Sequence, residues 1–175
     1  MSIFSQLLYR ISAFFRCRII NGPDQQPYLE RYHLLRLPFG YRVYLHRFVA
    51  SDPGRGLHNH PWRNAFSVVL AGCYEEVRML GADNDNTVIR RKIRSGNLNR
   101  INGSIFHRIN LIDDRECWTL FVHSPSSQSW GFLQPQNYRY AFHDHEKIVR
   151  QSSNPEWWKT AARPLRFPDM RKPLS

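Results

Sequence analysis

The chain has 175 residues, 14% of them aromatic, so it is long enough for one domain with a hydrophobic core and too aromatic to be disordered over most of its length. Its formal net charge of +11 favours an anionic partner, although no zinc-finger, RNP-like or helix-turn-helix pattern accompanies the charge. The three cysteines lack C-x-x-C spacing and are odd in number, as is typical of reduced cysteines. The sequence also shows no apolar run that could span a bilayer and no signal-peptide pattern, so we expect a cytoplasmic protein.

Residues 2–19 carry apolar side chains at helical spacing, which predicts an amphipathic helix. The apolar positions are Ile3, Leu7, Leu8, Ile11, Phe14 and Phe15. Asn21-Gly22-Pro23 is expected to end this helix, and residues 21–27 to form a linker. Because the apolar stripe needs a partner surface, we expect it to dock against a sheet or across a homodimer. Three arginines and no acid in the first 20 residues leave binding to a membrane surface as an alternative.

From residue 28 the chain changes to short aromatic and branched segments separated by turn residues, which predicts β-strands. The predicted strands are 28–37, 41–50, 65–70, 73–80, 87–94, 98–101, 105–109 and 117–123. Turns are expected at Pro38-Phe39-Gly40, over 51–56 and at Ala71-Gly72, with an exposed hairpin loop over 81–86. Many short strands punctuated in this way predict an antiparallel sandwich or barrel of the jelly-roll kind.

The strand signals fade after Trp130-Gly131-Phe132. Residues 147–175 contain seven lysines or arginines, two acids and four prolines. Adjacent tryptophans are unusual in a disordered tail, so Trp157 and Trp158 predict that this basic extension packs partly on the barrel, with the last dozen residues loose.

The segment Gly56-Leu57-His58-Asn59-His60-Pro61-Trp62 holds the strongest functional signal. His58 and His60 project from one face of a strand, because side chains alternate with period 2, and two such imidazoles can bind one metal ion. His107, in a later strand-like segment, is the candidate third ligand. The rival pair, His143 and His145, has no apolar strand or Gly turn after it, which is typical of a solvated polar segment. His46 precedes the motif and is a candidate fourth ligand or neighbouring base.

This pattern resembles the cupin superfamily. His58, His60 and Gly72 fall at the offsets of the first cupin motif and His107 fits the second, whereas the glutamate position is Ala65, which cannot bind a metal. A narrower similarity, to small and mostly uncharacterised cupin-like proteins that are often phage-borne, covers roughly residues 28–142. It rests on H-N-H-P-W, L-A-G-C-Y-E-E, H-R-I-N-L, C-W-T-L-F-V and W-G-F. The resemblance implies an all-β, cupin-type double-stranded β-helix over 28–142, with the helix and linker in 1–27 and the basic extension in 143–175.

Three neutral histidines without a carboxylate leave coordination positions for water, dioxygen or substrate. Such a site suits Fe(II), which we expect first, with Zn, Mn, Ni or Cu as alternatives. Cysteine dioxygenases are similar in this respect, but in that family a cysteine that becomes cross-linked to a tyrosine often matches the position of Ala65. Close mechanistic equivalence is therefore not expected.

Trp62, Ser67 and Tyr74 are the candidate substrate-binding residues, each with a purely structural alternative. Glu76 shares a strand face with Tyr74, where a phenol and a carboxylate suit acid–base work. The resemblance favours an Fe(II)-dependent oxygenase acting on a small or peptide-borne substrate. The alternatives are a non-enzymatic binding module for an anionic ligand, nucleic acid or protein partner, and a metal-independent sugar-nucleotide epimerase, for which the sequence places no aspartate beside the histidines. Whether the protein is an enzyme is left open.

Overall fold

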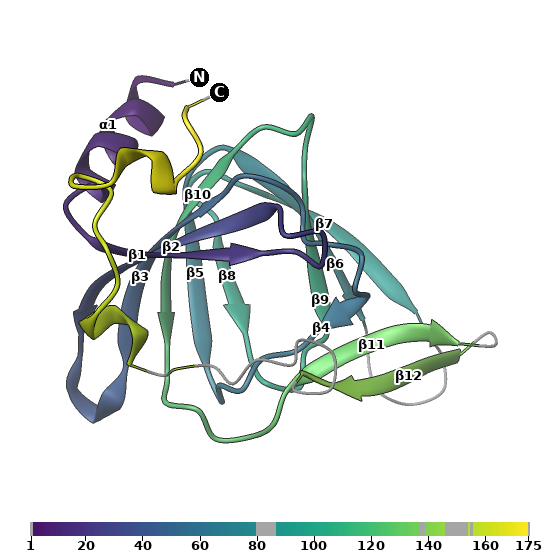
Figure 1. Cartoon of the computed structure of the whole chain (residues 1–175). Coiled ribbons are helices and arrows are strands. Elements are labelled where there is room, and N and C mark those ends of the chain that lie inside the picture. Colours follow the sequence, from purple (N-terminus) through teal and green to yellow (C-terminus); the bar gives the residue numbers. More distant parts are fainter. Residues whose placement is uncertain (1, 80–86, 137–138, 146–153, 155, 175) are drawn as a thin grey trace.

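Two six-stranded antiparallel sheets face each other in the computed structural model, which describes residues 2–79, 87–136, 139–145, 154 and 156–174 (Figure 1). The first sheet has the order β1 (Arg16–Asn21), β2 (Pro27–Arg36), β3 (Arg42–Phe48), β10 (Cys117–His123), β5 (Ala65–Ala71) and β8 (Leu98–Ile101). The second has the order β12 (Arg139–Asp144), β11 (Gly131–Gln136), β4 (Leu57–His58), β9 (His107–Leu111), β6 (Cys73–Met79) and β7 (Val88–Arg94). The predicted all-β jelly roll is confirmed. The loop expected over 81–86 lies outside the described residues.

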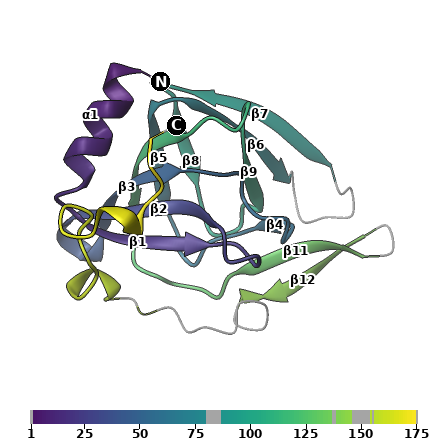
Figure 2. The same ribbon diagram turned by 45° about the horizontal axis from the view of Figure 1, so that its top comes forward.

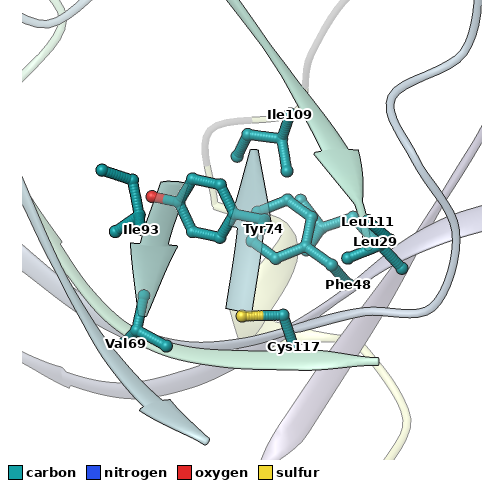
Figure 3. Close-up of a cluster of buried hydrophobic side chains, with 8 residues drawn as sticks. All are labelled: Leu29, Phe48, Val69, Tyr74, Ile93, Ile109, Leu111 and Cys117. Carbon is teal, nitrogen blue, oxygen red and sulfur yellow. The ribbon is translucent and has the colours of Figure 1, made fainter. Parts of the chain in front are cut away.

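One cluster of buried hydrophobic side chains lies between the sheets. Tyr74 of β6 lies at the centre of this cluster (Figure 3). Around it pack Leu29, Phe48, Val69, Ile93, Ile109, Leu111 and Cys117. Inward side chains come from alternate positions of each strand, as the pleat requires. The turn into β6 needs Gly72, whose φ of 82° is costly for residues with a Cβ.

The N-terminal helix is present but shorter than predicted. Helix α1 covers Ile3–Ser12, and the Ser2 hydroxyl caps it by accepting a hydrogen bond from the Ser5 backbone N–H at 3.1 Å. Residues 16–19, expected to be helical, belong to strand β1 (Arg16–Asn21), which pairs with β2 along its whole length. The backbone of β1 gains these cross-strand hydrogen bonds, and tertiary pairing outweighs the helical spacing of its side chains. Residues 21–27 are therefore the turn region of a hairpin and not a linker.

Helix α1 packs on the outer face of the first sheet (Figure 2). Leu8 is buried there against a cluster that includes Cys17, Tyr32 and Trp118. The remaining apolar side chains of the helix region face outward: Ile3, Phe4, Leu7, Ile11 and Phe14 are exposed. The predicted homodimer stays a prediction. Among the described residues, no helix has the length and apolar content needed to cross a bilayer.

Two strands follow the point near residue 132 where the strand signals of the sequence fade. Strands β11 and β12 form a hairpin that continues the second sheet beyond β4. Their sequences contain Pro135, Gln134 and Gln136, which are poor strand formers, and the hairpin lies at the edge of the sheet where such residues are tolerated. His143, expected in a solvated polar segment, pairs with Phe132 inside this hairpin.

The C-terminal segment 156–174 returns to the first sheet, and Figure 1 shows both chain ends close together beside α1. Trp157 is buried with Tyr44 and Phe121. The expectation that the last dozen residues are loose is wrong, because Arg47 donates hydrogen bonds to the carbonyls of Lys172 and Pro173 at 2.6 and 2.9 Å. Residues 171–173 and α1 thus lie on the outer face of the first sheet, while Trp157 lines the cavity on its inner side.

Candidate metal centre

Three histidines from the second sheet converge on one point. His58 ends β4, His107 begins β9, and the two residues are register partners across the strands. His60 lies two residues past His58, beyond the end of the short strand, yet its ring centroid is only 4.9 Å from that of His58. One ligand nitrogen from each residue lies within 4.8 Å of the other two, and no other group of three or more His, Cys, Asp or Glu side chains gathers in this way among the described residues.

The spacing of the nitrogens suits a single divalent ion. The Nε2 atoms of His60 and His107 are 2.9 Å apart. Two imidazoles bound at right angles, each about 2.0–2.1 Å from an ion, place their nitrogens about 3 Å apart. The same distance also suits a hydrogen bond between two neutral rings. The candidate ligands are three imidazoles, and no carboxylate belongs to the group. Imidazole ligands suit borderline metals such as Fe, Zn or Ni.

One buried carboxylate orients the ring of His107, and a second lies near the ring of His58. Glu76 of β6 accepts a hydrogen bond from Nδ1 of His107 at 2.8 Å, which turns Nε2 of that ring toward the other histidines. Asp52 lies 3.7 Å from Nδ1 of His58, and its Oδ2 accepts the backbone N–H of Ile109 at 2.8 Å. Carboxylates in this outer position fix the tautomer and orientation of metal-binding histidines.

Sequence reasoning missed the placement of both carboxylates. It found no aspartate beside the histidines, whereas Asp52 stands next to His58. It named acid–base work with Tyr74 as one option for Glu76 beside a structural role, whereas Glu76 is held by His107, Arg78 and Arg91. The sequence did contain a signal for each carboxylate. Asp52 lies in the turn six residues before His58, and Glu76 lies on the strand that pairs with the strand of His107.

The electrostatics keep the site in the form that binds metal. Burial, and then the neighbouring imidazoles, hold the pKa values of His58 and His60 well below their usual range. Burial alone raises the pKa of the Glu76 carboxyl, but hydrogen bonds from His107, Arg78 and Arg91 outweigh it and leave the pKa lowered. At neutral pH two of the three imidazoles are thus neutral, with free lone pairs, and the carboxylate behind the third is ionised.

The three predicted substrate-binding residues line one cavity with the histidines. This cavity, of about 840 Å³, lies between the sheets, and its walls include Trp62, Ser67 and Tyr74. Trp62 stacks on His60, with ring centroids 4.7 Å apart, so it stands directly beside the centre. Tyr74 lies deeper, in the core cluster, where burial raises the pKa of its phenol and its oxygen accepts a hydrogen bond from Asn99.

The other histidine candidates stand apart from the centre. His46 lines the same cavity, but its Nε2 accepts a hydrogen bond from Nε of Arg31 at 3.0 Å, so that nitrogen is not free to be a fourth ligand. His145 stacks on Trp130 with ring centroids 3.9 Å apart. His143 lies on β12. The rival pair therefore does not assemble a second three-residue group within the described part of the chain.

We expect the metal-free protein to lose stability as the pH falls below about 6.5. Burial lowers the pKa of His46, His58 and His60 and lowers that of His123 to about 3, so the unfolded chain takes up protons that the folded chain does not. Their stabilising effect is complete above the unfolded pKa and declines below it, by about 1.4 kcal/mol per pH unit for each histidine. Urea unfolding at pH 7.5 and at pH 5.5, roughly one unit to either side of that value, measures the slope. The variant His123→Gln should show a smaller slope, and equal stability at both pH values would contradict the expectation.

No protein-family model matches the chain, and no curated protein is significantly similar to it. Solved structures do align with it. An oxalate oxidase in complex with glycolate aligns with a TM-score of 0.49 and 16% identity, over 65% of this chain and 59% of that one. An oxalate decarboxylase from Lactobacillus farciminis aligns with a TM-score of 0.47 and 20% identity, over 67% of this chain and 32% of that one. This chain thus spans less than two thirds of either protein.

A cupin-2 domain protein from Shewanella frigidimarina also aligns, with a TM-score of 0.41 and 13% identity, over 54% of this chain and 79% of that one. Similarities at this level carry no information on substrate or reaction. The fold itself rests on the two facing antiparallel sheets and on the strand order described above. The chain is thus an all-β jelly roll of two facing antiparallel sheets with one N-terminal helix.

Proposed function

We propose that the protein is a metal-dependent cupin enzyme in which His58, His60 and His107 bind one divalent ion, with Fe(II) as the native metal and an oxygenase reaction on a small or peptide-borne substrate. The observation that carries the proposal is the convergence of the three imidazole nitrogens within 4.8 Å at the wall of a large cavity. The carboxylate of Glu76 supports it, because it accepts the Nδ1 proton of His107 and so turns Nε2 of that ring toward the centre, and Asp52 lies 3.7 Å from Nδ1 of His58.

The protein's own residues would hold the ion, orient the ligand rings and keep water away from the centre. Glu76 keeps the proton of His107 on Nδ1, and Asp52 is placed to do the same for His58. The indole of Trp62 covers one face of His60 and shields the centre on that side. Fe(II), when bound, would supply one-electron chemistry with dioxygen. Substrate would approach through the cavity, whose walls carry aromatic side chains that favour an apolar or planar body.

Metal analysis and oxygen uptake test the two levels of this proposal separately. After anaerobic loading with Fe(II) and gel filtration, we expect about one ion to be retained per chain. A fraction of small molecules extracted from cells serves as the source of substrate. With it, the Fe(II)-loaded protein should consume oxygen, while the Zn(II)-loaded protein, whose metal has no redox chemistry, should not. Failure to retain any divalent metal contradicts the centre. Retention without oxygen uptake contradicts the oxygenase.

A non-enzymatic binding module for an anionic ligand remains the second candidate. It is favoured by the arginines that line the cavity, Arg18, Arg31, Arg36, Arg42 and Arg55. If the protein binds an anion tightly but leaves it unchanged with every metal, this function replaces the oxygenase. Binding of nucleic acid would instead weaken steeply with salt, because phosphate contacts release counterions.

A further inference from the structure

Four polar side chains form a row across the inner face of the first sheet. Arg18 of β1 is the register partner of Arg31 on β2, Arg31 is the partner of His46 on β3, and His46 is the partner of Thr119 on β10. Figure 1 shows these strands side by side in this order. All four residues line the cavity. Neighbouring strands lie about 4.8 Å apart, so the row is a continuous polar strip on the wall made by this sheet.

The two arginines of this row have no counter-charge among the described residues. Arg31 donates from Nε to His46 and lies with its guanidinium carbon 5.5 Å from the ring centre of Tyr44, but it has no carboxylate partner. The described part of the chain gives Arg18 no hydrogen bond or ion pair at all through its side chain. Like charges directly opposite each other on adjacent strands are destabilising.

Other arginines of the two sheets do have carboxylate partners. Arg47, on the opposite face of the same sheet, is paired with Glu30 and Glu116. On the second sheet, Arg78 and Arg91 share Glu76. Arg18 and Arg31 in the cavity have no such partner among the described residues.

The rest of the cavity does not neutralise this pair either. Among the described lining residues, Asp52 is the sole acid, and it is engaged by the N–H of Ile109 beside His58. At the other end of the row, the Thr119 hydroxyl is buried, with 1% of the residue exposed, and has no hydrogen-bond partner among the described residues. One wall therefore presents positive charge and an unused hydroxyl, and the facing wall presents the three histidines.

We propose that Arg18 and Arg31 bind the anionic group, a carboxylate or a phosphate, of the molecule that enters this cavity. A guanidinium fork matches two oxygens of either group, and two forks side by side relieve their mutual repulsion when they share one anion. Thr119 extends the strip by one more donor. The inference deepens the proposed function by giving its substrate class, a small organic acid or phosphate ester whose body reaches across the cavity toward the histidines.

Binding to the metal-free protein tests this site apart from the metal centre. Phenyl phosphate and benzoate are the anionic probes, and benzamide is the neutral probe of the same shape as benzoate. By calorimetry, we expect the wild type to bind at least one anionic probe and to bind benzamide much more weakly. Arg31→Gln should weaken binding of that anion by about 10–100-fold, because it removes charge-assisted hydrogen bonds. Arg18→Gln should weaken it in the same direction.

Arg94→Gln is the matched control, because Arg94 is exposed on β7 and the substitution changes the net charge equally. Loss of anion binding in Arg94→Gln as large as in Arg31→Gln would overturn the proposal, as would equal binding of benzoate and benzamide, or no binding of either anion.

Thermal unfolding tests whether a loss of binding comes from a folding defect. Without anion, Arg31→Gln should melt at or above the wild-type temperature, since it relieves the repulsion with Arg18, and phosphate should stabilise the wild type more than the variant. If the anion binds as expected but no metal is retained, only the oxygenase proposal fails.

Discussion

Replacing His107 with alanine is expected to abolish retention of divalent metal through gel filtration. The variant leaves two imidazoles, which hold a divalent ion far more weakly than three, and it leaves the buried carboxylate of Glu76 without its 2.8 Å partner. His58→Ala and His60→Ala should have the same effect, because each removes one of the three converging nitrogens. Metal content per chain, measured after loading and filtration, is the readout.

His143→Ala is the control, because His143 lies on β12 and does not belong to the three-histidine group. Its metal content should equal that of the wild type. The conservative variants Glu76→Gln and Asp52→Asn should retain metal with about 10–100-fold weaker affinity, as is usual when the outer partner of a ligand histidine is changed. Metal retained in His107→Ala but lost in His143→Ala would move the site to the β11–β12 hairpin and remove the basis of the proposed function.

The second large effect is expected at Arg47, on the other face of the first sheet. Arg47→Met should lower the free energy of unfolding by about 3–5 kcal/mol, since breaking a buried ion pair leaves its partners charged and unpaired. Arg47 is 1% exposed and lies 3.1 Å from Glu30, which is itself fully enclosed, and it also pairs with Glu116. Urea unfolding of the wild type and the variant at neutral pH measures the difference.

Arg90→Met is the matched control for this substitution. Arg90 pairs with Glu75 at 2.7 Å, but the two side chains are 61% and 33% exposed. Solvent-exposed pairs contribute only about 0–1 kcal/mol, so this variant should unfold almost like the wild type. Arg47 also holds the carbonyls of Lys172 and Pro173, so Arg47→Met should in addition speed proteolytic removal of the C-terminal segment. Similar losses of stability in the two variants would refute a special contribution of the buried network.

The sequence predicted strand bounds best where a strand is a continuous apolar run between polar turn residues. The strand predicted over 117–123 has the bounds of β10, because nearly all of its side chains are enclosed and its ends are marked by polar turn residues. The predicted strand over 98–101 also has the bounds of β8, and β6 begins directly after Gly72, as predicted. An H-x-H segment and one later histidine were also enough to nominate three residues, because strand geometry limits which side chains share a face.

Local patterns misled where pairing with a distant segment decided the conformation. Residues 16–19 continue the helical spacing of α1, but β2 offers them a full set of backbone partners and they become strand. The hairpin of β11 and β12 has weak strand formers, and its position at a sheet edge makes those residues acceptable. A helix needs only its own residues, whereas a strand needs a neighbour that the local sequence does not reveal.

By itself the sequence determined the fold class, the positions of most strands along the chain and the choice of the three histidines as candidate ligands. Only the tertiary structure decided what surrounds them. It placed Asp52 beside His58 and Glu76 behind His107, and it aligned Arg18 with Arg31 on the facing wall. These pairs join residues 6 to 31 positions apart, and two of them, Arg18–Arg31 and Glu76–His107, join neighbouring strands. Register depends on the packing of the whole barrel, and so the electrostatic character of the cavity is a property of the folded chain and not of any one segment.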